Sequence, residues 1–374
     1  MISELSIEKM RKSLDDANLR WPPVPLTTPK ELRERYPLSD GGVATVYNGR
    51  ESVKKILRGD DQRKLLIVGP CSIHDIDAAK EYARAIKSLA ESVQDQFLVI
   101  MRTYLEKPRT EQGWPGLMYD PNLNGSFDID QGLIWSRKLL CDIAELGLPT
   151  ATETLEPLPI QYISDLPSWT CIGARTVESQ PHRKLASALS TPIGVKNGTS
   201  GDLEGAVNAL KVIQRPNSFI GMDMDGKYSK VDTNGNSYCH IILRGGQNGK
   251  PFTNYDEESV ERAQRKLEEN GLPQRLVIDC SHGNALSEGK KDYRRQIDVF
   301  RDVIGQIVRG NAGIMGLMLE SNIHEGSQKV PSGIKDPKEL RYGVSITDPC
   351  ISLEATRELV MEGCRMLREY NARK

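Results

Sequence analysis

No apolar run in this sequence approaches the roughly 20 residues that a membrane-spanning helix requires. Residues 1–20 are charged throughout and lack the apolar segment of a secretory signal peptide. The 50 lysines and arginines are balanced by 51 aspartates and glutamates, so the chain lacks the basic excess of nucleic-acid-binding domains. We therefore expect a cytoplasmic protein with neither a membrane nor a nucleic acid as its partner. Any anion site must be made by local clustering of cations.

The seven cysteines are an odd number and include no C-x-x-C pair. This argues against a zinc ribbon and against a disulfide framework. It is typical of reduced thiols in the cytosol, where most cysteines are small buried apolar residues. A position in the core is therefore the default interpretation of any single cysteine in this chain.

From about residue 64 onward, short apolar runs alternate with patterns at helical spacing. The runs are continuous rather than alternating, which is typical of strands buried on both faces. The predicted strands are 65–72, 97–104, 149–154, 170–175, 192–197, 239–245, 276–283 and 313–321. The predicted helices lie near 78–89, 133–144, 157–166, 183–189, 256–270, 293–308 and 352–370. This order predicts the α/β class, as a (β/α)8 TIM barrel over residues 64–374. A doubly wound open sheet is the alternative, although G-x-G-x-x-G does not follow the first strand.

Two segments fall outside this repeat. Residues 1–63 form an N-terminal extension, in which a Thr-Pro start predicts a short helix within 25–37. Residues 219–240 precede the sixth strand, and Asp225-Gly226 and Asn234-Gly235 predict the turns of an inserted β-hairpin. Additions of this kind make subunit contacts or regulatory sites, or they simply cap the barrel.

The C-terminal ends of the predicted strands carry charged or metal-binding side chains. In strand order, these residues are Cys71, Arg102 with Lys107 beyond it, Glu153, Arg175, Lys196, Arg244, His282 and Glu320. A single charged residue at a strand end needs no functional explanation, because strands must emerge into water. TIM-barrel enzymes build their active sites at this face, and eight such ends at one mouth indicate a site.

Five of these residues are cations in a chain of net charge −1, namely Arg102, Lys107, Arg175, Lys196 and Arg244. They predict a site for multiply charged anions, because arginine holds phosphate or carboxylate bidentately and lysine supplies a point charge. The alternative is that each is paired with a carboxylate. Among the middle strand ends only Glu153 is acidic, and one acid cannot neutralise all five.

Cys71, His282 and Glu320 offer a sulfur, a nitrogen and an oxygen, and Asp348 after the last strand would add a fourth ligand. Mixed ligation of this kind suits Mn, Fe, Co, Zn or Cu better than Mg or Ca. Taken singly, each has a structural interpretation: Cys71 as a buried small residue, and His282 as a hydrogen-bonded residue or a general base. Together at one barrel mouth, they predict a site for one divalent metal ion.

Motifs at these residues resemble those of type I 3-deoxy-D-arabino-heptulosonate-7-phosphate (DAHP) synthases, in the order of that family. They are GPCSIHD (69–75), MRTYLEKPRT (101–110), GART-ESQ-HR (173–183), KNGT (196–199), HIILRGG (240–246), DCSHGN (279–284), LMLES (317–321) and SITDPC (345–350). The resemblance runs from about residue 25 to the C-terminus. It implies the condensation of phosphoenolpyruvate with erythrose 4-phosphate, with release of phosphate, as the first step of the shikimate pathway.

The resemblance also implies roles for individual residues. The implied metal ligands are Cys71, His282, Glu320 and Asp348. The implied phosphoenolpyruvate site is Arg102, Lys107, Arg175, Lys196 and Arg244, with Glu153. Arg109 and Thr110 match contacts to erythrose phosphate, and Lys107 and His282 are the candidates for proton transfer.

Members of this family are commonly inhibited by one aromatic amino acid, in a pocket that uses the N-terminal extension and the inserted hairpin. The resemblance therefore implies such an effector and a homodimer or homotetramer. The matching positions are near Ile160, Gln161, Leu185, Leu189, Ser190, Phe219 and Gly221. Ile160 and Gly221 stand where a proline and a serine are usual, so loss of feedback inhibition is the alternative.

Two other functions compete with this interpretation. The first is 3-deoxy-manno-octulosonate-8-phosphate synthase, which performs the same chemistry on arabinose 5-phosphate. That family lacks the extension and carries an asparagine in its variant of KPRT (107–110), so both features favour erythrose 4-phosphate. The second is a non-catalytic barrel that senses aromatic amino acids. Such a barrel predicts erosion of the site, yet every matched ligand and cation is present.

Overall fold

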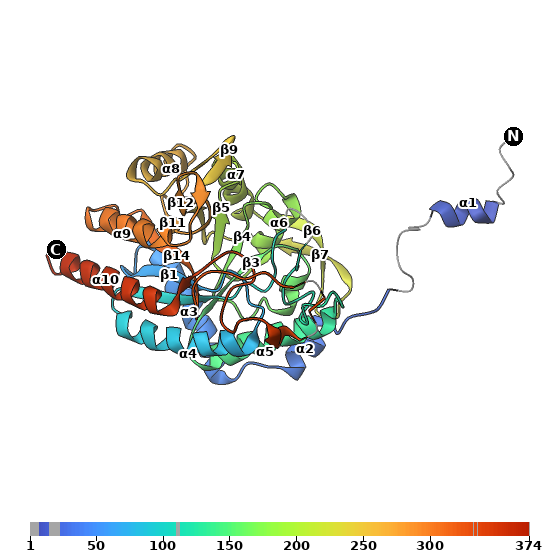
Figure 1. Ribbon diagram of the computed structural model, residues 1–374. Coiled ribbons are helices and arrows are strands. Elements are labelled where there is room, and N and C mark those ends of the chain that lie inside the picture. Colours follow the sequence, from blue (N-terminus) through green and yellow to red (C-terminus); the bar gives the residue numbers. More distant parts are fainter. Residues whose placement is uncertain (1–6, 15–22, 110–112, 332, 335, 374) are drawn as a thin grey trace.

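Eight parallel strands form a closed barrel in the computed structural model, which describes residues 7–14, 23–109, 113–331, 333–334 and 336–373 (Figure 1). The barrel strands are β1 (Lys64–Gly69), β2 (Phe97–Arg102), β3 (Thr150–Thr154), β4 (Trp169–Ile172), β5 (Ile193–Lys196), β8 (Cys239–Leu243), β11 (Leu276–Asp279) and β14 (Ile314–Asn322). Each pairs with the next, and β1 also pairs with β14, which closes the sheet. The predicted (β/α)8 TIM barrel is confirmed, and the open-sheet alternative is wrong.

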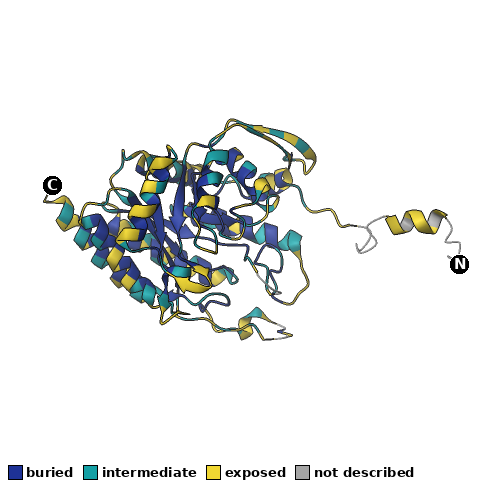
Figure 2. Ribbon diagram, turned by 90° about the horizontal axis from the view of Figure 1, so that it is seen from above, coloured by how far each residue is buried: buried dark blue, intermediate teal, exposed yellow. Residues whose placement is uncertain are grey.

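Helices surround the barrel and leave their exposed faces on the outside (Figure 2). They are α4 (Ile76–Val93), α5 (Ile129–Glu145), α6 (Gln180–Ala188), α7 (Glu204–Ile213), α8 (Glu257–Glu269), α9 (Arg295–Val308) and α10 (Leu353–Asn371). The helix predicted near 157–166 is wrong, because only the 3-10 helix η1 (Pro159–Tyr162) forms there. Pro157 and Pro159 remove backbone donors, and a proline ring clashes with the carbonyl four residues before it. Helix α7 was not predicted from the sequence.

Alternate residues of the strands face two different cores. Leu65 and Ile67 of β1 point into the barrel, where they meet Trp169 and Ile242 from other strands. Leu66 and Val68 belong to the larger core between the barrel and its helices. Burial on both faces explains why the strands read as continuous apolar runs. Among the described residues, no helix combines the length and the apolarity that crossing a bilayer requires.

Two helices of the N-terminal segment pack against the barrel. The short predicted helix is α2 (Pro29–Arg35), which begins with a capping box between Thr28 and Glu31. A longer helix, α3 (Asp40–Arg58), was not predicted. Its residues Val53 and Ile56 join the inner core and cover the N-terminal end of the barrel. By contrast, α1 (Ile7–Leu14) is drawn away from the barrel in Figure 1.

The inserted hairpin consists of β6 (Asn217–Met222) and β7 (Tyr228–Thr233), which pair antiparallel. Asp225-Gly226 lies in its turn, as predicted, and Gly226 has a φ of +78°. The hairpin therefore spans 217–233 rather than 219–240, and Asn234-Gly235 is not a hairpin turn. Gly235 instead begins the connection to β8, where an added Cβ would lie 2.4 Å from the Gln214 carbonyl oxygen. Only glycine fits this close approach.

Candidate active site

The C-terminal ends of the strands surround a cavity of about 420 Å³. Its lining includes Arg102, Tyr104, Lys107, Pro108, Arg109, Glu153, Ala174, Arg175, Lys196, Arg244, His282, Lys291 and Asp348. A second cavity of about 650 Å³ adjoins it and shares Arg175, Arg244, His282 and Lys291. The structure therefore brings the predicted strand-end cations to one mouth.

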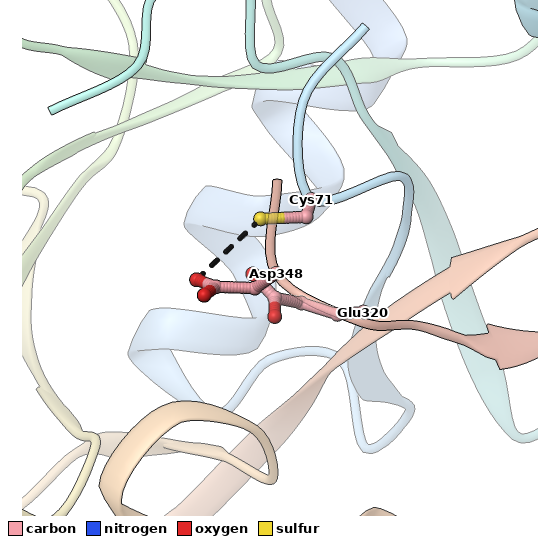
Figure 3. A group of neighbouring side chains, drawn as sticks. All are labelled: Cys71, Glu320 and Asp348. Carbon is pink, nitrogen blue, oxygen red and sulfur yellow. Dashed lines mark hydrogen bonds between the residues drawn. The ribbon is translucent and has the colours of Figure 1, made fainter. Parts of the chain in front are cut away.

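Three of the four predicted metal ligands lie together on one side of this mouth. Cys71 follows β1, Glu320 lies in β14, and Asp348 lies in the loop before α10. The pairing of Gly69 with Glu320 places the ends of β1 and β14 side by side. Ligand atoms of the three residues all lie within 4.8 Å of one another, and their side chains point toward one another in Figure 3. The Cys71 Sγ lies 3.7 Å from Asp348 Oδ2.

His282 approaches this group from the 3-10 turn η2 (His282–Asn284). Its Nε2 lies 3.5 Å from Glu320 Oε1, while its Nδ1 lies 2.9 Å from Asp279 Oδ2 and 2.6 Å from Ser281 Oγ. A φ of +54° places His282 in the left-handed region, which non-glycine residues rarely adopt outside constrained sites. Asp279 was not predicted as a site residue, although it is the last residue of β11 and directly precedes the Cys-Ser-His sequence.

These residues fit a divalent metal ion. A thiol, two carboxylates and an imidazole form a mixed donor set that suits transition metals. Within the described part of the chain, the buried Glu320 Oε2 has no hydrogen-bond partner, so it is left for a ligand such as a cation. A metal-bound histidine is usually supported at its far nitrogen, and here Ser281 Oγ makes that hydrogen bond while Asp279 lies within ion-pair distance of the same nitrogen.

Two of the predicted cations are paired with buried carboxylates. Arg102 Nη2 lies 2.9 Å from Glu320 Oε1, and Lys196 Nζ lies 2.5 Å from Glu153 Oε2. Burial acts to raise the pKa of Glu153, but Lys196 outweighs it and holds that pKa below its usual value. Burial likewise acts to raise the pKa of Glu320, but His282 and Arg102 hold that pKa below its usual value, so both carboxylates are ionised at neutral pH.

Lys107 reaches across the mouth to Cys71, Glu320 and Asp348, which we call the metal group. Its Nζ lies 2.9 Å from Cys71 Sγ and 3.4 Å from Asp348 Oδ2. Burial acts to lower the pKa of Lys107, but Cys71 and Asp348 raise it overall, so the amine is protonated. Lys291 was missed by the sequence analysis, yet its Nζ lies 3.1 Å from Asp348 Oδ1. It belongs to a small hairpin, β12 (Leu286–Ser287) and β13 (Lys290–Lys291), which no strand-end pattern identifies.

The remaining predicted substrate residues lie around the cavity. Arg175 follows β4, and Arg244 follows β8 with its backbone N–H donating to Asn197 Oδ1 at 2.9 Å. Burial lowers the pKa of Arg244, which lies at the mouth shared by both cavities. Arg109 is exposed, and its Nε donates to the Trp114 carbonyl at 2.8 Å. Thr110 lies outside the described residues.

The positions implied for an aromatic effector fall on neighbouring elements. Ile160 and Gln161 lie in η1, and the Gln161 carbonyl accepts a hydrogen bond from Arg33 of α2 at 3.3 Å. The others come from α6, the residues that follow it and β6, namely Leu185, Leu189, Ser190, Phe219 and Gly221. Ser187 Oγ of α6 lies 2.8 Å from Thr233 Oγ1 of β7, which joins the helix to the hairpin. The effector site itself stays a prediction.

Several known proteins are similar to this chain in sequence. The sequence model of the DAHP synthetase I family matches residues 39–361. The Tyr-sensitive phospho-2-dehydro-3-deoxyheptonate aldolase of Escherichia coli (strain K12) is 48% identical over 337 residues, which cover 90% of this chain and 92% of that protein. The Trp-sensitive enzyme of the same strain is 48% identical over 335 residues, which cover 90% and 93%.

A solved structure extends the comparison to the fold. The phospho-2-dehydro-3-deoxyheptonate aldolase of Francisella tularensis SCHU S4 matches with a TM-score of 0.88 and 39% sequence identity, over 94% of this chain and 99% of that chain. The range matched by the family model includes the barrel strands, the metal group and the cations of the mouth. This chain belongs to the DAHP synthetase I family.

Proposed function

We propose that this chain is a metal-dependent DAHP synthase, which condenses phosphoenolpyruvate with erythrose 4-phosphate and water to give DAHP and inorganic phosphate. Membership in the family makes it an enzyme that forms a carbon–carbon bond, at the first step of the shikimate pathway. One observation carries the assignment of the site. The thiol and carboxylate group of Cys71, Glu320 and Asp348 lies beside the cation-lined cavity.

We infer that the aldehyde approaches the metal group, because this group lies beside the cation-lined cavity proposed for phosphoenolpyruvate. A divalent ion such as Mn, Fe, Co or Zn, held by Cys71, Glu320 and Asp348 with His282 Nε2 as the fourth donor, would supply a Lewis acid for the aldehyde oxygen. Asp279 fixes the ring of His282, so Nε2 rather than Nδ1 faces the group. Because His282 is committed to this task, we assign proton transfer at the substrate oxygens to Lys107, whose protonated Nζ lies beside Cys71 and Asp348.

The cations that line the cavity would bind phosphoenolpyruvate. Arg175, Lys196 and Arg244 hold its phosphate group and stabilise the charge that develops as phosphate leaves. Arg102 and Lys107 line the same cavity and contact the proposed metal ligands Glu320 and Cys71, which suits the carboxylate of phosphoenolpyruvate. Arg109 and Thr110 would contact the phosphate of erythrose 4-phosphate.

Phosphate release measured with two aldoses tests this function. We expect turnover with erythrose 4-phosphate and phosphoenolpyruvate, and its loss after chelation with recovery on adding metal. Faster turnover with arabinose 5-phosphate would assign the chain to 3-deoxy-manno-octulosonate-8-phosphate synthesis. Release of phosphate with neither aldose would favour the non-catalytic sensor. If Cys71→Ala keeps wild-type metal affinity, Cys71 is not a ligand.

Feedback regulation and assembly are part of the same proposal. The two Escherichia coli relatives are named as Tyr-sensitive and Trp-sensitive. We infer that this chain responds to one aromatic amino acid near η1, α6 and β6, and that it works in the cytoplasm as a homodimer or homotetramer. Activity measured with millimolar Phe, Tyr and Trp in turn tests the first point, and light scattering tests the second. Inhibition by none of the three would mean that feedback has been lost.

A further inference from the structure

Glu106 is a buried carboxyl group directly before Lys107, and the proposed chemistry does not use it. Only 6% of the residue is exposed to solvent. Its Oε1 accepts a hydrogen bond from the Tyr119 hydroxyl at 3.0 Å, and its Oε2 accepts one from the Leu155 N–H at 3.3 Å. A buried carboxyl with two specific donors is costly to keep unless the bonds serve the structure or the site.

The two arms of the loop that carries Lys107 and Arg109 are held to each other by backbone bonds. The Lys107 N–H donates to the Pro115 carbonyl at 2.9 Å, and the Met118 N–H donates to the Leu105 carbonyl at 3.3 Å. At Gly116, which has a φ of +118°, an added Cβ would lie 2.4 Å from the Leu105 carbonyl oxygen. These contacts set the shape of the arms, 105–109 and 113–119.

The bond from Leu155 joins this loop to a different part of the molecule. Leu155 directly follows β3, which carries Glu153 into the cavity. The Leu155 carbonyl in turn lies 2.6 Å from His182 Nε2 of α6. Glu106 therefore connects an arm that bears two substrate cations to the rigid end of a barrel strand.

We propose that Glu106 is a positioning residue for the phosphorylated aldose, because it attaches the loop of Lys107 and Arg109 to β3 and fixes these cations at the mouth. This proposal rests on the function proposed above. A carboxyl suits the task because it can accept the Tyr119 and Leu155 hydrogen bonds whether it is ionised or protonated.

The surroundings of Glu106 also determine its charge. Tyr119 faces it from the loop, and the acids Glu153 of β3 and Glu156 just beyond that strand act on it from the other side. Burial, together with these two acids, raises the pKa of Glu106 to about 8. The group is therefore mainly neutral at pH 7, and its ionisation at higher pH adds a negative charge beside a site for anions.

Steady-state kinetics of Glu106→Ala, Glu106→Gln and the control Glu156→Gln test the proposal, with metal affinity measured by calorimetry. For Glu106→Ala we expect the KM for the aldose phosphate to rise about tenfold, from the loss of two hydrogen bonds, with metal affinity unchanged. The wild-type KM should rise above about pH 8 as Glu106 ionises, and Glu106→Gln, which is neutral at every pH, should lack this rise. Glu156→Gln, which changes an exposed carboxylate facing the same group, should leave the KM at pH 7 close to that of the wild type.

A folded Glu106→Ala protein with an unchanged KM would overturn the proposal, and so would an equal change in metal affinity and KM. If this variant does not fold, the alkaline pH profile of Glu106→Gln decides, and a profile identical to that of the wild type overturns it. The wild type is assayed first with both aldoses. Turnover there preserves the proposed function whatever the Glu106 variants show.

Discussion

The C-terminal and N-terminal ends of the barrel interior are filled with different kinds of side chain. At the C-terminal mouth, buried charges meet in pairs, as in Arg102 with Glu320. At the N-terminal end, Trp169 stacks on His240 with ring centroids 5.9 Å apart, beneath the apolar side chains of α3. Burial lowers the pKa of His240 to about 3, so its imidazole is uncharged at neutral pH.

This difference shows how the barrel divides its tasks. Buried ion pairs cost desolvation energy and rarely add stability, so their place at the mouth indicates that they serve ligands. The N-terminal end stabilises the fold by apolar packing, as is usual for this face of TIM barrels. Substitutions at the mouth should therefore change metal binding and turnover, with an added loss of stability where they leave a buried charge unpaired, and those at the N-terminal end should change stability alone.

The largest effect is expected for Glu320→Gln at the mouth. It removes a proposed metal ligand, so kcat should fall by about 10³-fold, since a Lewis acid contributes several kcal/mol. It also leaves Arg102 with an uncompensated buried charge, which costs about 3–5 kcal/mol in the free energy of unfolding. Phosphate-release assays and urea unfolding measure the two effects. A variant with wild-type metal content and turnover would contradict the proposal that the mouth binds the metal.

At the opposite end, Trp169→Ala should destabilise the fold without changing the chemistry. Trp169 is completely buried, and its loss leaves a cavity that lowers the free energy of unfolding by about 3–5 kcal/mol. Turnover per folded molecule should stay within about twofold of the wild type, because the site lies at the other end. Chemical unfolding together with active-site titration gives both numbers. A large drop in turnover of the folded protein would contradict the division of tasks.

Asp279→Asn tests whether support of His282 matters for metal binding. The change keeps the size of the side chain but removes the negative charge 2.9 Å from His282 Nδ1. Supporting groups of this kind contribute about 10- to 100-fold to metal affinity. Calorimetric titration with Mn²⁺ or Zn²⁺ measures the loss. The neighbouring Ser281→Ala serves as a control for the second contact of the same nitrogen.

The smallest effect is expected for His240→Phe and depends on pH. The pKa of His240 is about 3 in the folded chain and close to 6.5 in an unfolded one, so the unfolded chain takes up the proton first. Stability from this group is complete above about pH 6.5 and is lost as the pH falls toward 3. At pH 5.5 the loss amounts to about 1.4 kcal/mol. Unfolding curves at pH 7.5 and 5.5 should show a smaller difference for His240→Phe than for the wild type.

Local sequence patterns predicted most of the barrel, but only part of the N-terminal extension and of the inserted hairpin. Continuous apolar runs identify strands buried on both faces, and their order places Cys71, Lys196 and Glu320 at one face. The helix predicted near 157–166 does not form, because Pro157 and Pro159 allow only a single tight turn. The hairpin turn predicted at Asn234-Gly235 was wrong, because a glycine that permits a hairpin turn also permits a close contact with another segment.

The sequence by itself determined the barrel, its mouth, the chemical identity of the proposed metal donors and the cations near them. Tertiary structure decided which of these side chains meet. The register of β1 on β14 brings Cys71 to Glu320, the hairpin of β13 carries Lys291 to Asp348, and the end of β3 binds Glu106. Burial pattern repeats along the chain and can be read locally. Contacts between residues far apart in sequence depend on strand register and loop path, which no local pattern contains.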